Sequence, residues 1–214
     1  MFNIVCQYLY RICYTGEIMI LTHRLQEAIN EAARLHRDQF RKDAMKTPYI
    51  THVVGVMILL SSATHDEDIL IAGLLHDALE DIPDFMPEEL EKKFGTRVKD
   101  IVMGVTETSK LHGTPHGSWR EVKNAYLENL KNAPEESVLV SLADKIQNTR
   151  SLIEMIHLAQ GEELAKFGSS HEDRLWFNEE VLKIGEGRLG DDHVLVEEFR
   201  METEEMKKAL AKFA

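Results

Sequence analysis

The sequence predicts an all-α fold built as one compact multi-helix domain, and three observations lead to this prediction. Apolar residues recur at the three- and four-residue spacing of a helix in most segments of the chain. Apolar and polar residues alternate in no run long enough for a half-buried strand. Residues that favour helix ends, such as Thr22, Gly95 and Ser118, stand at the borders of the helical segments.

Two helices are expected early in the chain. Thr22 caps the first helix, whose apolar side chains form one stripe. This stripe consists of Leu25, Ala28, Ile29, Ala32 and Leu35. A polar loop over residues 43–47 ends at Pro48, and an apolar helix over residues 51–62 begins near His52.

Two helices of unequal length are expected next. The longer one begins at Asp66 or Asp68 and continues through Asp81, where a following proline ends it. The shorter one covers residues 88–94 and stops at Gly95, because glycine is favoured just beyond a helix C-terminus.

The centre of the chain contains two helices separated by a loop. Apolar residues mark a helix over residues 98–105. Lys110 to Gly117 contains two glycines, two histidines and a proline, and we expect a mobile loop there. Ser118 and Glu121 have the spacing of a capping box, which opens a helix through Leu130.

The C-terminal part predicts one long helix and then amphipathic segments. The long helix covers residues 134–159, and the segments cover residues 170–183 and 192–211. Neither a repeat nor a linker divides the chain, so residues 21–214 are expected to form a single domain.

Residues 1–20 are expected to be an N-terminal arm or an extra helix. They lack the basic start and the small-residue cleavage site of a signal peptide. Arg11 and Glu17 also make this stretch unsuitable for crossing a membrane. The sequence leaves open whether Met1 or Met19 is the true start of the chain.

Composition and charge exclude several functions. The formal net charge of −12 argues against binding to nucleic acid or to an anionic membrane, because such binding relies on clustered lysine and arginine. An anionic small molecule held by a metal ion is compatible with this charge. The two cysteines, Cys6 and Cys13, cannot form a disulfide framework, so a cytoplasmic location is expected. The sequence leaves the oligomeric state open, and a homo-oligomer is compatible with it.

The most informative stretch is Leu74 to Asp81, where four ionisable side chains interrupt an apolar helix. At about 3.6 residues per turn, His76 and Glu80 share one face of a helix, and Asp77 and Asp81 share the neighbouring face. Burial of such groups is costly unless a metal ion or a polar cleft receives them. One such residue alone would indicate only a solvated helix end, so other ligands are needed to support a site.

Further ligands stand on two other expected helices. His52 lies at a helix start, and Asp144 follows an apolar run, with Asn148 one turn beyond it. Together with His76 and Asp77 they supply two imidazoles and two carboxylates. This mixed nitrogen and oxygen set suits manganese, iron, magnesium or zinc, with positions left for water or phosphate oxygens. The lack of thiolate ligands argues against a structural zinc site.

The pattern of His52, His76-Asp77 and Asp144 resembles that of the HD-domain metal-dependent phosphohydrolases. The surrounding sequence resembles the hydrolase domain of the RelA/SpoT alarmone enzymes and their stand-alone small hydrolase relatives, including the metazoan SpoT homologue. The matching segments are His36–Lys42, Pro48–His52, Leu74–Asp81, Phe94–Gly95, Gly104–Thr106 and Leu142–Arg150. The synthetase domain of the long enzymes does not fit in the remaining residues, so the resemblance is to hydrolase-only members.

This resemblance implies the helical HD-domain fold and an activity on a nucleotide. The implied activity removes the 3′-diphosphate of guanosine tetra- or pentaphosphate by attack of water and releases pyrophosphate. The implied ligands of one divalent metal ion, with Mn²⁺ preferred, are His52, His76, Asp77 and Asp144. Glu80 and Asp81 would orient or deprotonate the attacking water and handle the leaving-group proton. Arg41 would flank the purine, Lys42 would meet phosphate, and Asn148 and Ser151 would lie against the nucleoside.

The chain also departs from the family pattern. The loop between Lys42 and Pro48 is longer than usual, and Ser141 stands where the family usually has a lysine. Because the metal-binding pattern is intact, these changes bear on the substrate more than on the reaction class. Two alternatives stay open: a hydrolase of another nucleotide, such as an adenosine alarmone, a deoxynucleotide or the 2′-phosphate of NADPH, and a nucleotide-sensing module without turnover. His36 is expected to orient nearby carboxylates or to pack in the core, not to bind metal.

Overall fold

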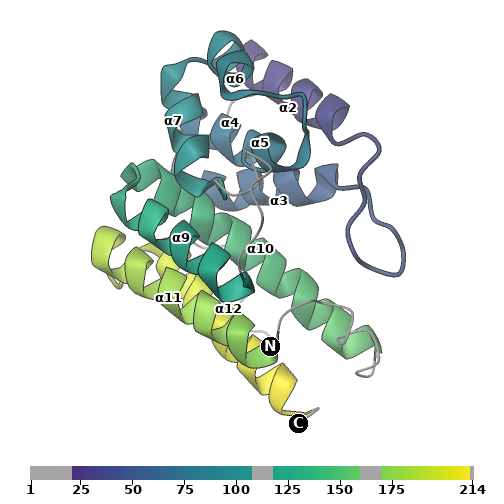
Figure 1. The fold of residues 1–214 in the computed structure, drawn as a ribbon, viewed down its shortest axis with the longest axis vertical. Coiled ribbons are helices and arrows are strands. Elements are labelled where there is room, and N and C mark those ends of the chain that lie inside the picture. The colour runs from purple at the N-terminus through teal and green to yellow at the C-terminus, as the bar shows by residue number, and fades with distance from the viewer. Residues whose placement is uncertain (1–20, 108–117, 160–169, 213–214) are drawn as a thin grey trace.

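The structure, a computed structural model, describes residues 21–107, 118–159 and 170–212 (Figure 1). Within these ranges the regular secondary structure is helical, apart from one isolated antiparallel bridge between Phe40 and Pro48. The predicted all-α fold is therefore confirmed. The arm expected over residues 1–20 and the loop expected from Lys110 to Gly117 lie outside the described residues.

Ten helices are found in the described ranges, and none of them is long and apolar enough to cross a membrane. They are α2 (His23–Leu35), α3 (Ile50–Ser61), α4 (Glu67–Leu75), α5 (Ala78–Asp81), α6 (Pro87–Phe94), α7 (Thr96–Val105), α9 (Trp119–Asn132), α10 (Glu135–Ala159), α11 (His171–Leu189) and α12 (Val194–Ala211). The predicted caps are confirmed, since the Thr22 and Asp66 side chains accept first-turn N–H groups and Ser118 and Glu121 form a capping box. The helix predicted over residues 170–183 extends further, to a stop at Gly190.

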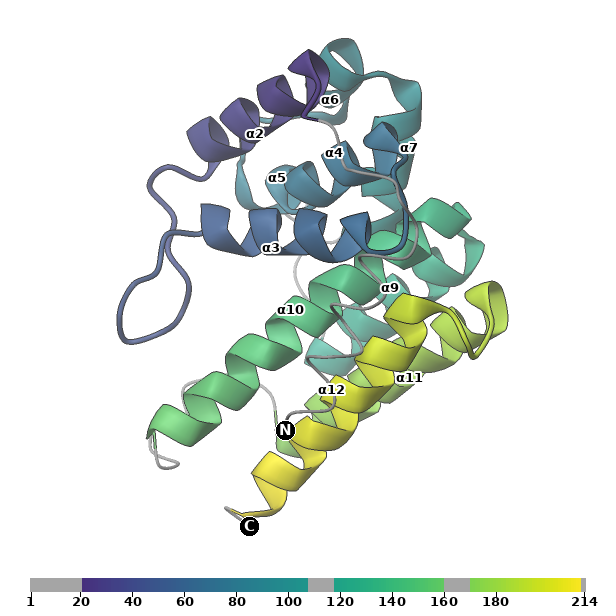
Figure 2. The same ribbon diagram turned by 180° about the vertical axis from the view of Figure 1, so that it is seen from behind.

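The helices form two groups that share α10. Helices α2 to α7 lie on one side of α10, and α11 and α12 pack along its other side (Figures 1 and 2). Helix α9 packs against α7 and α11. Because α10 contacts α3 and α4 as well as α11 and α12, side chains on α10 can meet residues from both groups.

Helix α10 contributes to two apolar cores. Leu142 and Ile146 belong to the main core, which includes side chains of α3, α4 and α7. Near the end of the helix, Ile156 packs with Met206 of α12 in a second, smaller core. Asp144 is itself buried, so the helix carries its carboxylate into the interior.

The helix predicted to continue through Asp81 is interrupted at His76 and Asp77, so this prediction is wrong. Helix α4 ends at Leu75, and a separate single turn, α5, follows. The backbone of Asp77 lies at φ −90° and ψ −7°, and its carbonyl accepts the N–H groups of Glu80 and Asp81. Because the helix is interrupted here, the side chain of Asp77 can turn toward His52 of α3 and that of His76 toward Asp144 of α10.

Two helical glycines are expected to respond oppositely to replacement by alanine. A Cβ atom on Gly104 of α7 would lie 2.8 Å from the Cβ atoms of both Ala133 and Ser137, so Gly104→Ala overpacks this contact. We expect it to lower the free energy of unfolding by about 1–3 kcal/mol. Gly187→Ala in α11 meets nothing within 4 Å and should raise it by about 0.5–1 kcal/mol. Urea titration of both variants measures the difference, and a stable Gly104→Ala protein would contradict this packing.

Candidate metal and nucleotide site

Four predicted ligand side chains from three parts of the chain converge at one point, which we call the His-Asp centre. His52 stands in the first turn of α3, His76 and Asp77 stand between α4 and α5, and Asp144 is on α10. His52 Nε2 lies 3.4 Å from Asp77 Oδ2 and 3.2 Å from Asp144 Oδ1. His76 Nε2 lies 3.1 Å from Asp77 Oδ2 and 3.6 Å from Asp144 Oδ1. The predicted meeting of these residues is thus found in the structure.

The donor atoms of the His-Asp centre fit a divalent metal ion. Its two imidazoles are almost fully buried, with His52 1% and His76 3% exposed. Neither Nε2 atom makes a hydrogen bond of good geometry to the described residues. The Nδ1 atoms are occupied, because His52 Nδ1 lies 2.5 Å from Gln147 Oε1 and His76 Nδ1 lies 2.8 Å from Gly73 O. Since these oxygens only accept hydrogen bonds, each Nδ1 carries a proton, and Nε2 is the ring atom directed at the centre, where it binds a metal ion once it has lost its own proton.

Burial opposes charge at the His-Asp centre, but neighbouring charges outweigh burial. Burial lowers the pKa of His76, yet Asp77 and Asp144 raise it well above its ordinary value. Burial raises the pKa of Asp144, yet Lys145 and the two imidazoles hold it well below its ordinary value. Burial also raises the pKa of Asp77, yet the two imidazoles likewise hold it well below its ordinary value, so both carboxylates are ionised at neutral pH, which is the form that binds a cation.

Three residues that support the His-Asp centre were not identified as site residues from the sequence. The hydroxyl of Tyr49 donates to Asp77 Oδ2 at 2.6 Å, and Lys145 Nζ donates to Asp144 Oδ2 at 2.5 Å. Both residues stand within or beside the motif segments, so their positions were a usable signal. Gln147 also stands in a motif segment, but its contact could not be predicted from the sequence because its partner in α3 is 95 residues away.

Glu80 and Asp81 lie beside the centre but in different cavities. Glu80 lines a small cavity of about 160 Å³ together with His76 and Asp77, and its Oε1 accepts the Glu107 N–H at 2.7 Å. Asp81 lines a larger cavity, and its backbone carbonyl accepts a hydrogen bond from a glutamine of the α2–α3 connection. The sequence predicted that the four ionisable side chains of Leu74 to Asp81 project into one region. In the structure His76, Asp77 and Glu80 line the small cavity, whereas Asp81 lines the larger one.

The larger cavity has a volume of about 670 Å³ and adjoins the small one. Among the described residues, both cavities are lined by Tyr49, Lys123, Lys145 and Asn148. The four residues predicted to contact substrate all line the larger cavity. They are Arg41, Lys42, Asn148 and Ser151. This volume is in the range of known small-molecule sites.

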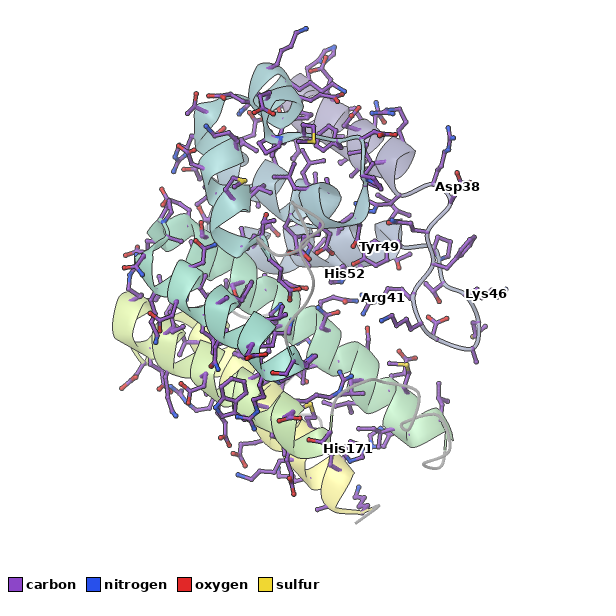
Figure 3. All side chains as sticks on the ribbon, in the orientation of Figure 1. Asp38, Arg41, Lys46, Tyr49, His52 and His171 are labelled. Atoms are coloured by element: carbon purple, nitrogen blue, oxygen red, sulfur yellow. The ribbon has the colours of Figure 1, made fainter. Side chains whose placement is uncertain are left out.

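The long loop over residues 43–47 leaves Arg41 close to the site. The loop is closed at its base, where Arg41 N donates to Thr47 O at 2.8 Å. The guanidinium of Arg41 donates to Asn148 Oδ1 at 3.0 Å, across to α10. Figure 3 shows Arg41 turned toward α10, while Lys46 lies at the outer edge of the loop. The extra residues therefore leave Arg41 at the larger cavity, and Asp43, Ala44, Met45 and Thr47 of the loop line that cavity as well.

Ser141 leaves a neutral hydroxyl in the small cavity. Its Oγ lies 2.7 Å from the hydroxyl of Tyr126, and burial raises the pKa of Tyr126 to about 12, so both groups are neutral. Lys123 and Lys145 line the same cavity. Lys123 and Lys145 thus supply positive charge to this cavity, whereas position 141, where the family usually has a lysine, supplies none.

His36 packs beside the site and is not among the residues whose ligand atoms converge. In the described chain, ligand atoms of His52, His76 and Asp144 all lie within 4.8 Å of one another, and Asp77 Oδ2 lies close to both imidazoles. His36 is buried, with Nδ1 2.5 Å from Gln39 Oε1. Gln39 in turn donates a hydrogen bond to the backbone carbonyl of Asp81. This geometry agrees with the expectation that His36 packs and orients its neighbours.

Known proteins share this fold and much of this sequence. Residues 28–167 match the family model described as HD domain. The chain is 38% identical to the guanosine-3′,5′-bis(diphosphate) 3′-pyrophosphohydrolase of Drosophila melanogaster over 131 residues, which are 60% of this chain and 69% of that relative. The human protein of the same name is 39% identical over 131 residues, with the same shares. A solved structure of a metazoan SpoT orthologue that hydrolyses ppGpp has a TM-score of 0.67 and 28% identity, covering 89% of this chain and 97% of the other.

Proposed function

Because this chain belongs to the HD domain family, we propose that it is a guanosine-3′,5′-bis(diphosphate) 3′-pyrophosphohydrolase. Water attacks the phosphorus bonded to the ribose 3′ oxygen, the bond between that phosphorus and the 3′ oxygen breaks, and pyrophosphate is released together with guanosine 5′-diphosphate, or guanosine 5′-triphosphate from the pentaphosphate. The observation that carries this proposal is the His-Asp centre beside a small cavity, which adjoins a cavity large enough for a nucleotide.

The metal ligands of the proposed enzyme are His52, His76, Asp77 and Asp144. Two buried Nε2 atoms without hydrogen bonds of good geometry and two ionised carboxylates support this assignment. Among the divalent ions that imidazole and carboxylate together can bind, we propose Mn²⁺, the ion that the resemblance to the alarmone hydrolases implies. The ion would lower the pKa of the attacking water and offset charge on the phosphoryl oxygens.

We propose that Glu80 orients and deprotonates the attacking water. Its carboxylate lines the small cavity beside His76 and Asp77 and is held by the Glu107 N–H. A carboxylate in this position can orient the water and accept its proton. Asp81 lines the larger cavity, on the side where the nucleoside leaves, so we assign to it the proton of the departing 3′ oxygen.

The nucleoside occupies the larger cavity in this proposal. Arg41 flanks the purine with its planar guanidinium, which is suited to stacking. Asn148 accepts a hydrogen bond from Arg41, so the two residues fix each other beside the base. Ser151 lies one turn further along α10 and contacts the nucleoside, and Lys42 contacts phosphate.

The test is the release of pyrophosphate from guanosine tetraphosphate by the purified chain. We expect release with Mn²⁺ and none with a chelator. NADPH, a deoxynucleotide and an adenosine alarmone serve as competing substrates. Preferential cleavage of one of them would overturn the substrate and keep the hydrolase, whereas tight nucleotide binding without product would indicate a sensing module.

Three further expectations stay predictions. The cysteine content predicts a cytoplasmic location, the net charge predicts no nucleic-acid partner, and a homo-oligomer is compatible with the sequence. Measurement of the mass in solution would fix the oligomeric state.

A further inference from the structure

Lys123 on α9 brings a positive charge to the junction of the two cavities. It lines the small cavity with His76, Asp77 and Glu80, and it also lines the larger one. Lys145 is the other lysine among the described residues of the small cavity, and its ammonium lies against a carboxylate of the His-Asp centre. Lys123 therefore adds a charge that does not belong to that centre.

The ammonium of Lys123 is held in place by two kinds of contact. It forms an ion pair with the buried carboxylate of Glu107. It also lies 4.8 Å from the ring centroid of Phe177, 5.8 Å from that of Trp119 and 5.9 Å from that of Tyr126. Aromatic faces attract cations at these distances. The side chain is only 18% exposed, so neighbouring groups and not solvent surround most of it.

The small cavity otherwise contains much negative charge. Its described lining includes the carboxylates of Asp77, Glu80, Glu107 and Asp144. A diphosphate that enters this cavity has to approach these carboxylates, and one divalent ion does not balance them. A lysine ammonium donates charge-assisted hydrogen bonds to phosphate oxygens and reduces this repulsion.

We propose that Lys123 binds the 3′-diphosphate of the substrate and, after cleavage, the released pyrophosphate. This inference rests on the proposed function, which places the 3′-diphosphate in the small cavity and the nucleoside in the larger one. Lys123 stands where the two meet, so its ammonium is within the path of the diphosphate.

The test compares Lys123→Met with Glu107→Gln, using inorganic pyrophosphate as the probe. Calorimetric titration of the Mn²⁺-loaded proteins measures binding without any turnover. Because a hydrogen bond to a charged group is involved, Lys123→Met should weaken pyrophosphate binding roughly 10- to 100-fold. Glu107→Gln leaves the ammonium in place and keeps the N–H donated to Glu80, so pyrophosphate should bind at least as tightly as in the wild type. Lys123→Arg should recover part of the lost affinity.

Lys131→Met is the matched control, since Lys131 is an exposed lysine of the same helix paired with Glu128. It should bind pyrophosphate like the wild type. Equal affinity of Lys123→Met and wild type would overturn the proposal, and so would equal losses in Lys123→Met and Glu107→Gln, which would indicate that the pair only holds the fold. If the wild type does not cleave guanosine tetraphosphate but its pyrophosphate binding depends on Lys123, the anion site is supported and the proposed substrate fails.

Discussion

Asp144→Asn is expected to abolish metal binding and turnover together. The substitution keeps the shape of the side chain and one of the two hydrogen bonds that Asp144 accepts from Lys145 and Asn148, but it removes the negative charge. Asp144 Oδ1 is the oxygen that lies 3.2 Å from His52 Nε2 and 3.6 Å from His76 Nε2. Loss of a residue that merely orients a metal ligand costs about 10- to 100-fold, so loss of this ligand should reduce pyrophosphate release by more than about 100-fold.

Thermal unfolding with and without Mn²⁺ separates the loss of metal from the loss of folding in Asp144→Asn. A ligand at 100 times its dissociation constant stabilises the folded state by about 2.7 kcal/mol, so the wild type should unfold at a higher temperature when Mn²⁺ is added. Asp144→Asn should fold and show no such shift. Asp38→Asn, an exposed aspartate outside the site, is the control and should behave like the wild type (Figure 3). A full Mn²⁺ shift in Asp144→Asn would exclude this residue as a ligand.

The parts of the fold that depend on local chemistry could be predicted from the sequence. The caps at Thr22 and Ser118 and the stop at Gly95 depend on residues a few positions apart, so the sequence contains their whole cause. The interruption at His76 and Asp77 was missed because apolar residues surround it on both sides and no glycine or proline marks it. Its cause is tertiary, since the two side chains turn toward partners on α3 and α10.

The same division applies to the site. His52, the His76-Asp77 pair and Asp144 could be recognised because ionisable side chains in apolar helices need a partner, and their residue types limit what that partner is. The residues around them are placed by packing between distant helices. Lys123 reaches the small cavity only because α9 packs against α7 and α11, and nothing in its own sequence segment distinguishes it from the exposed Lys131.

Glu80→Gln is expected to keep the metal and lose turnover, in contrast to the loss of both in Asp144→Asn. The glutamine can still accept the Glu107 N–H that reaches Oε1 at 2.7 Å, so the local structure should persist. It cannot accept a proton from water at neutral pH. Because general base catalysis contributes about 10²- to 10⁴-fold, kcat for pyrophosphate release should fall by that factor. The Mn²⁺-dependent shift in unfolding temperature should stay at the wild-type value.

The comparison with Glu88→Gln decides how a loss in Glu80→Gln is interpreted. Glu88 is an exposed glutamate in the first turn of α6, so its replacement changes the same charge without touching the cavities. Wild-type kcat in Glu88→Gln and a large loss in Glu80→Gln would locate the proton acceptor beside His76 and Asp77. If Glu80→Gln also loses the Mn²⁺ shift, Glu80 acts on the metal and the proton acceptor has to be sought elsewhere. If its kcat is unchanged, the attacking water is not handled by Glu80, and Asp81 becomes the residue to replace next, because it lines the adjoining cavity.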